Sequence, residues 1–107
     1  MPKSIKLVND TYIDASGVVG IRGVISSGNL NDYGQSKDAG MWYVLNGVTN
    51  SPSNYCMLIV VAGYNSDNSV AIQLIVGQGS MWTRRRVGSG TSYSWEPWYR
   101  YQGSRVD

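Results

Sequence analysis

Few residues of this 107-residue chain could carry out acid–base or nucleophilic chemistry. The chain contains no histidine, so the commonest general base and metal ligand is missing. Its one cysteine, Cys56, lies in an apolar run and is expected to be buried as a small hydrophobic residue. A single cysteine cannot form an intramolecular disulfide. We therefore expect neither a cysteine nucleophile nor a metal site built from cysteine and histidine.

The carboxylates favour structural roles over catalysis. Asp10, Asp32, Asp38 and Asp67 stand beside Asn, Ser, Lys or Gly, as turn residues do. Glu96 is the only glutamate and lies between two tryptophans, an arrangement that sugar-cleaving enzymes use. Such enzymes need a second carboxylate about 5 to 9 Å away, and none is evident. The sequence therefore predicts a protein without catalytic residues, cofactor or metal.

Three of the six arginines of the chain are consecutive. In the run Arg84, Arg85 and Arg86, strand alternation places the first and third side chains on one face and Arg85 on the other. We expect Arg84 to stack on an aromatic ring or to donate to turn carbonyls, because a planar guanidinium does both well. Arg85 and Arg86 are expected to be solvated.

Aromatic residues are abundant near the C-terminus. Trp95 and Trp98 are three residues apart, so in a regular strand they point to opposite faces, one buried and one lateral. Tyr93, Tyr99 and Tyr101 share the parity of Trp95, which predicts a ladder of rings on one face. Core packing is the simplest role for the two tryptophans.

Exposed rings beside amide side chains are also typical of saccharide sites. The apolar face of a sugar stacks on a ring, while amides bind its hydroxyl groups. The candidate saccharide-binding residues are Tyr55, Tyr64, Asn65, Asp67, Trp82, Arg84, Tyr93 and Trp98. Basic and aromatic side chains in the same region could instead bind single-stranded nucleic acid, but the net charge of +2 is low for that function.

Short apolar segments between turn residues must position these side chains. Thirteen glycines, eight tyrosines and only 15% charged residues favour strands over helices. Strands are expected at 41–45, 55–62, 70–76, 81–87 and 95–101, with one helical turn after a Ser or Asn cap in 26–34. The strand at 55–62 is expected to be buried on both faces. The sequence therefore predicts a single all-β fold, a compact antiparallel sheet or sandwich.

The first 27 residues differ from the rest. Residues 4–13 alternate around Asn9 and Asp10, which predicts a strand, a turn and a second strand. Residues 17–25 place β-branched side chains between glycines, a pattern suited to packing against copies of the same chain. We therefore expect an N-terminal β and oligomerisation segment at 1–27 and a β domain at 28–107.

Several short motifs follow one another in a recognisable order: the runs Asn29–Tyr33, Gly40–Tyr43, Asn50–Pro52, Met57–Val60, Gln73–Arg84 and Trp95–Trp98. Together they resemble the pyocin-knob-like domain found in tail fibres and other adsorption proteins of phages, prophages and tail-like bacteriocins. The resemblance covers roughly residues 28 to 100. Gln73 matches a glutamine of the middle strand, which could satisfy carbonyl groups. Cys56 departs from the glycine usual in that family.

The resemblance implies a homotrimeric tail-fibre or spike protein of the virion that recognises a bacterial surface polysaccharide beside other fibre subunits. We expect synthesis in the host cytoplasm and no membrane insertion, because no signal-peptide pattern or apolar run of ~20 residues is present. We also expect no nucleic-acid binding, because the net charge is low. Two alternatives are a purely structural trimerising or capping virion component without a ligand, and a single-stranded nucleic-acid-binding β domain.

Overall fold

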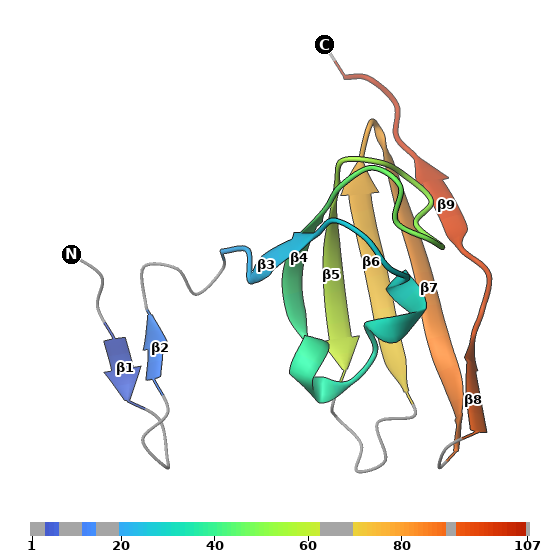
Figure 1. Cartoon of the computed structure of the whole chain (residues 1–107). Helices are drawn as coiled ribbons and strands as arrows, with labels where there is room; N and C mark the ends of the chain where they lie inside the picture. Colours follow the sequence, from blue (N-terminus) through green and yellow to red (C-terminus); the bar gives the residue numbers. More distant parts are fainter. Residues whose placement is uncertain (1–3, 7–11, 15–19, 63–69, 90–91, 107) are drawn as a thin grey trace.

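The computed structural model describes residues 4–6, 12–14, 20–62, 70–89 and 92–106 (Figure 1). A short antiparallel pair near the N-terminus is made of β1 (Ser4–Lys6) and β2 (Tyr12–Asp14). The main sheet has seven strands: β3 (Gly23–Ile25), β4 (Gly40–Val44), β5 (Cys56–Ala62), β6 (Ala71–Gly77), β7 (Ser80–Ser89), β8 (Ser92–Trp95) and β9 (Tyr99–Gln102). The expected β-rich fold and the N-terminal strand pair are confirmed.

The main sheet is a single mixed layer. Its strands follow the order β3-β4-β5-β6-β7-β8, and β9 also pairs with β7. The strand pairs are antiparallel, as expected, except that β3 and β4 are parallel. Residues 26–39 separate β3 from β4, and a crossover of that length allows the chain to return parallel. Through β3, the sheet extends into the segment expected at 1–27.

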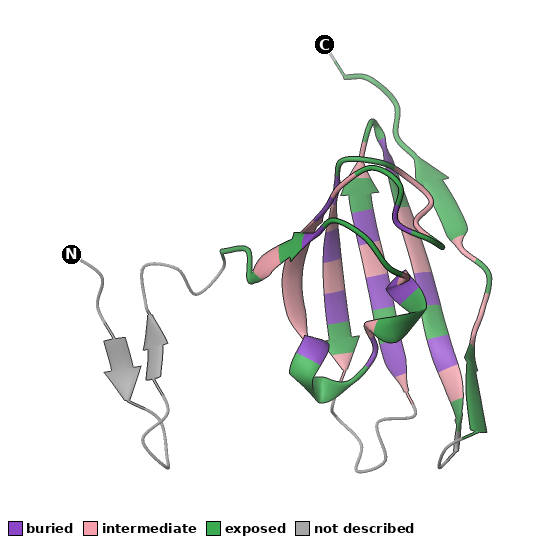
Figure 2. Cartoon of the chain, in the orientation of Figure 1, coloured by how far each residue is buried: buried purple, intermediate pink, exposed green. Residues whose placement is uncertain are grey.

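One face of the sheet is covered by the segments 26–39 and 45–55, which cross in front of it in Figure 1. We call this the inner face, and the opposite side the outer face. The core lies beneath these segments and consists of Ile25, Leu30, Val44, Val48, Cys56, Leu58, Val60 and Ile75. Alternate residues of β5 and β6 enter this core, as the banded colouring of Figure 2 shows.

The expectation that residues 55–62 are buried on both faces is wrong. Cys56, Leu58 and Val60 are buried on the inner face, whereas Val61 on the outer face is 48% exposed. The cause is the single-layer architecture, because no described segment packs over the outer side of β5. Alternate residues of this apolar run therefore face the buried core and the exposed outer face.

Two short 3-10 helices lie within the covering segment 26–39. Helix η2 (Leu30–Asp32) follows Asn29, whose side chain accepts a hydrogen bond from the backbone of Asn31 at 2.9 Å. The expected helical turn after an Asn cap is thus confirmed. Helix η3 (Ser36–Asp38) begins with a capping box, in which Asp38 accepts from the backbone of Gln35 at 3.0 Å. Leu30 anchors η2 in the core.

Strands β8 and β9 lie end to end along β7, with a bulge between them. Arg86 pairs with Trp95 and Thr83 pairs with Tyr99, so three residues, 96–98, oppose two residues of β7. The extra residue reverses the parity of side chains beyond it. The prediction of one regular strand at 95–101 is therefore wrong, and so is the prediction of opposite faces for Trp95 and Trp98.

The buried Cys56 thiol provides a test of the core. Cys56 is 1% exposed, and burial raises the pKa of its thiol, against a side-chain hydrogen bond with Ser51 that lowers it. Because the thiolate is the reactive species, we expect Cys56 to react with a disulfide reagent at pH 8 at least about 100-fold more slowly in the native protein than in denaturant. Equal rates measured by absorbance would contradict the described core.

Candidate functional site

Gln73 lies at the centre of the inner face. It is fully buried on β6, and its side-chain Nε2 donates to the backbone carbonyls of Leu30 at 2.7 Å and Tyr33 at 2.8 Å. Its Oε1 accepts a hydrogen bond from Nε of Arg84 at 2.9 Å. One amide therefore joins the covering helix η2 to the cation on β7. The expectation that Gln73 satisfies carbonyl groups is confirmed.

Arg84 is a buried cation held by aromatic rings. The residue is 6% exposed, and its Cζ lies 4.4 Å from the ring centroid of Trp95 and 4.4 Å from that of Trp98. Burial lowers its pKa to about 10, so the guanidinium still carries its charge at neutral pH. Its Nη2 is buried and has no hydrogen-bond partner among the described residues. The prediction of a stacked Arg84 is confirmed.

Arg86 repeats the arrangement two residues further along β7. Its Cζ lies 4.0 Å from the ring centroid of Tyr93 and 5.4 Å from that of Trp95, and its Nη2 donates to the carbonyl of Gly34 at 2.7 Å. The residue is 3% exposed, so the expectation that Arg86 is solvated is wrong. Strand alternation explains the result, because Arg86 shares the inner face with Arg84.

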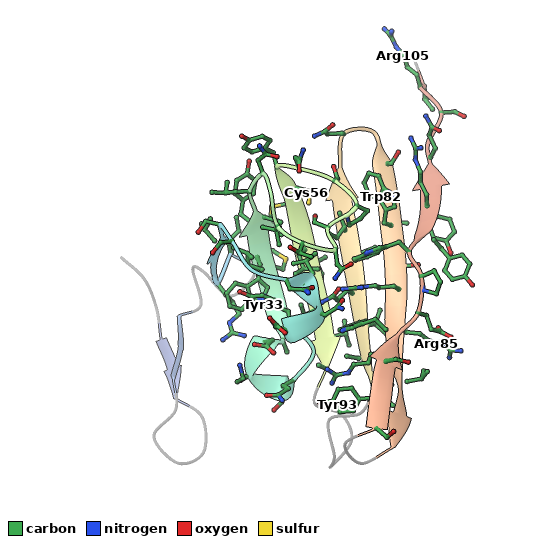
Figure 3. The ribbon with its side chains drawn as sticks, turned by 45° about the vertical axis from the view of Figure 1, so that its right-hand side comes forward. Tyr33, Cys56, Trp82, Arg85, Tyr93 and Arg105 are labelled. Carbon is green, nitrogen blue, oxygen red and sulfur yellow. The ribbon has the colours of Figure 1, made fainter. Side chains whose placement is uncertain are left out.

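Together these side chains form an alternating series of rings and cations, which we call the Arg–Trp ladder: Tyr93, Arg86, Trp95, Arg84 and Trp98. Arg85, between the two ladder arginines, points to the other side of the sheet. It pairs with Glu96 at 2.5 Å, and its side chain is 63% exposed, as expected. Figure 3 shows Tyr93 and Trp82 on the inner side and Arg85 on the outer side.

The bulge explains how both tryptophans reach one arginine. Trp95 precedes the extra residue and Trp98 follows it, so both indoles lie on the inner face. The same reversal carries Tyr99 and Tyr101 to the outer face, because they pair with Thr83 and Met81. The predicted ladder of tyrosines with Trp95 is therefore wrong for both tyrosines beyond the bulge.

Hydrogen bonds from the indole nitrogens connect the ladder to the covering loops. Trp95 Nε1 donates to the carbonyl of Asn31 at 3.0 Å, and Trp98 Nε1 donates to that of Asn50 at 2.9 Å. The approach is close at Gly34, where an added Cβ would lie 2.8 Å from Cζ of Arg86. A side chain at this position would push the loop away from the ladder.

A cleft of about 610 Å³ opens between the covering loops and the ladder. Its floor is formed by the ladder, and its rim by polar groups of the loops and of the segment after β8. The lining residues are Asn31, Asn50, Arg84, Arg86, Tyr93, Ser94, Trp95, Glu96, Pro97 and Trp98. The lining combines two buried cations, three rings and two amides. Such a surface can bind a hydroxylated or anionic ligand.

The predicted saccharide residues divide into three groups. Arg84, Tyr93 and Trp98 line the cleft. Tyr55 is 57% exposed just before β5, and Trp82 packs against the core beneath Arg100, so neither lines it. The remaining candidates, Tyr64, Asn65 and Asp67, lie outside the described residues.

Sequence reasoning missed several residues that line the cleft. The parity shared with Arg84 could have indicated Arg86. Nothing in the sequence places Asn31 and Asn50 together, because they come from separate loops. The structure joins those loops through Asn29, whose Oδ1 accepts from Asn50 Nδ2 at 2.9 Å.

The cleft has few ionisable side chains besides its two arginines. Glu96 is the one carboxylate in its lining, and that group is paired with Arg85. Within the described part of the chain, no group of three or more His, Cys, Asp or Glu residues could hold a metal ion. Nor does that part contain a helix with the length and apolar character needed to span a bilayer.

Comparison of the chain with models of known protein families, with curated proteins and with solved structures finds no match.

The hydrogen bonds of Gln73 give a test of how the site is held. Replacing Gln73 with Leu should lower the free energy of unfolding by at least about 3 kcal/mol, because two backbone carbonyls and a buried guanidinium each lose a partner. Urea unfolding followed by tryptophan fluorescence measures the change. Gln102, an exposed glutamine of β9, is the matched control, and its replacement with Leu should change the stability by less than about 0.5 kcal/mol.

Proposed function

We propose that this protein is a non-enzymatic tail-fibre or spike protein of a phage or prophage, and that its cleft binds a bacterial surface glycan during host adsorption. The viral setting is supported by the resemblance of the sequence motifs. The ligand class is supported by the cleft, where aromatic rings, guanidinium groups and amides converge on one hollow of the surface. That convergence is the observation that carries the proposal.

The ends of the Arg–Trp ladder provide the aromatic part of the site. Trp95 contacts both arginines, whereas Tyr93 and Trp98 each contact one arginine of the ladder. One face of each end ring is therefore not used within the ladder. Tyr93 is 38% exposed, so a sugar ring can stack on it by its apolar face.

The polar part of the site favours an acidic saccharide. Arg84 and Arg86 bring two positive charges to the cleft, and the negative charge of Glu96 is already paired with Arg85. A carboxylate or phosphate on the sugar would complement this charge. Asn31 lines the same hollow, and an asparagine amide can bind a hydroxyl group.

Binding of the protein to arrayed bacterial polysaccharides, acidic and neutral, tests this proposal. We expect the wild type to bind acidic saccharides and the double variant Asn31→Ala/Tyr93→Ala to bind at least about tenfold more weakly, because it loses an amide and a stacking ring. The matched control is Asn54→Ala/Tyr55→Ala, which alters exposed residues that do not line the cleft. This control should bind like the wild type.

Three results would contradict the proposal. One is a wild type that binds no saccharide on the array, and another is equal weakening in the two double variants. The third is tight binding of single-stranded oligonucleotides whose affinity falls steeply with salt, which would favour the nucleic-acid alternative. Thermal melting of each variant separates lost binding from lost folding.

A further inference from the structure

The outer face of the main sheet is apolar across most of its strands. Cross-strand pairing assigns to this face Met41 and Tyr43 of β4, three residues each of β5 and β6, and Met81, Thr83 and Arg85 of β7. The residues from β5 and β6 are Met57, Ile59, Val61, Ile72, Leu74 and Val76. Tyr99 and Tyr101 of β9 complete the surface.

Six of these apolar side chains are exposed, and the other five are half-buried. Val61 is 48% exposed and Val76 46%, while Tyr99 and Tyr101 are 60% and 53% exposed. Two hollows also lie on this side, one beside Val76, Met81 and Tyr101 and one beside Ile72 and Tyr99. An apolar, pitted surface of this kind is typical of a contact between proteins.

The size of the surface fits a stable interface. The five neighbouring strands β4, β5, β6, β7 and β9 are four to ten residues long. With an average of about seven residues, they span roughly 24 by 23 Å at the usual strand spacing and rise, or ~550 Å² before the relief of the side chains is counted. The largest apolar patch of a typical monomer is about 300–600 Å², and a stable interface buries about 800 Å² of accessible surface per partner. The outer face therefore approaches the area that one partner of a stable complex contributes.

The chemistry of the surface fits a second copy of the same chain. Among the residues assigned above, Arg85 is the one charged side chain, and it is paired with Glu96 at the margin. Two such faces can meet without burying an unpaired charge, whereas a partner chosen by charge would need a complementary group here. Apolar strand faces of this kind pack at about 10 Å, as in a sandwich.

We propose that copies of this chain associate through the outer face of the main sheet, each covering the Val, Ile, Met and Tyr side chains of another. The contact is separate from the cleft, which lies on the inner face, so it does not rest on the proposed ligand. It also differs from the contact that the sequence predicts at residues 1–27. The outer face supplies the second apolar layer that a single chain lacks.

Light scattering on a sizing column, at protein concentrations up to roughly 100 μM, tests the proposal, since even weak specific interfaces are populated at that concentration. We expect the wild type to elute as a defined multimer. The variant Ile72→Lys/Val76→Lys places two charges in the middle of the outer face and should elute as a monomer. Both residues are at least 40% exposed, so the variant should keep its fold, checked by circular dichroism.

The matched control is Ile21→Lys/Val106→Lys, which adds the same two charges at exposed residues that are not among those assigned to the outer face. This variant should remain a multimer. A monomeric wild type at the highest concentration would overturn the proposal. It would also be overturned by a multimer that the outer-face variant leaves intact, or that the two double variants dissociate equally. Saccharide binding by a monomeric outer-face variant would show that the cleft acts independently of this contact.

Discussion

The buried guanidinium of Arg84 is the interaction on which the rest of the structure depends. Gln73 fixes its Nε, and the indoles of Trp95 and Trp98 contact the guanidinium. A cation this deeply buried is stable only where rings and hydrogen bonds replace its hydration. Those same groups connect β6, β7, the segment after β8 and helix η2. The cleft exists because Arg84 holds these elements together.

The main sheet buries cations on its inner face and exposes apolar side chains on its outer face. The inner face also holds the hydrophobic core, so the two sides of the sheet differ in chemistry. The inner face has a cleft of rings, guanidinium groups and amides, and the outer face is continuous and apolar. Under the two proposals, the first surface meets a saccharide and the second meets further copies of the chain. An assembled fibre tip would then hold its copies by one side of each sheet and display a cleft on the other.

The sequence predicts the strands well and the site only in part. Alternation and turn residues locate β4 to β7, and they explain why Cys56 and Gln73 are buried. The bulge at 96–98 could not be predicted, because its evidence is the pairing of β8 and β9 with β7, which is a tertiary property. One inserted residue reverses parity, and this alone misplaces Trp98, Tyr99 and Tyr101. The prediction of a solvated Arg86 fails because charged residues are rarely buried, and the rings that offset its burial come from another strand.

Urea unfolding of the variant Arg84→Lys is the most direct test of this account. Lysine keeps the positive charge but lacks the planar guanidinium, which stacks on Trp95 and Trp98 and donates a hydrogen bond to Oε1 of Gln73. We predict that the free energy of unfolding falls by at least about 2 kcal/mol and that acrylamide quenches tryptophan fluorescence more strongly, as the segment after β8 loosens. Stability within about 0.5 kcal/mol of the wild type, with unchanged quenching, would contradict the central role of the guanidinium.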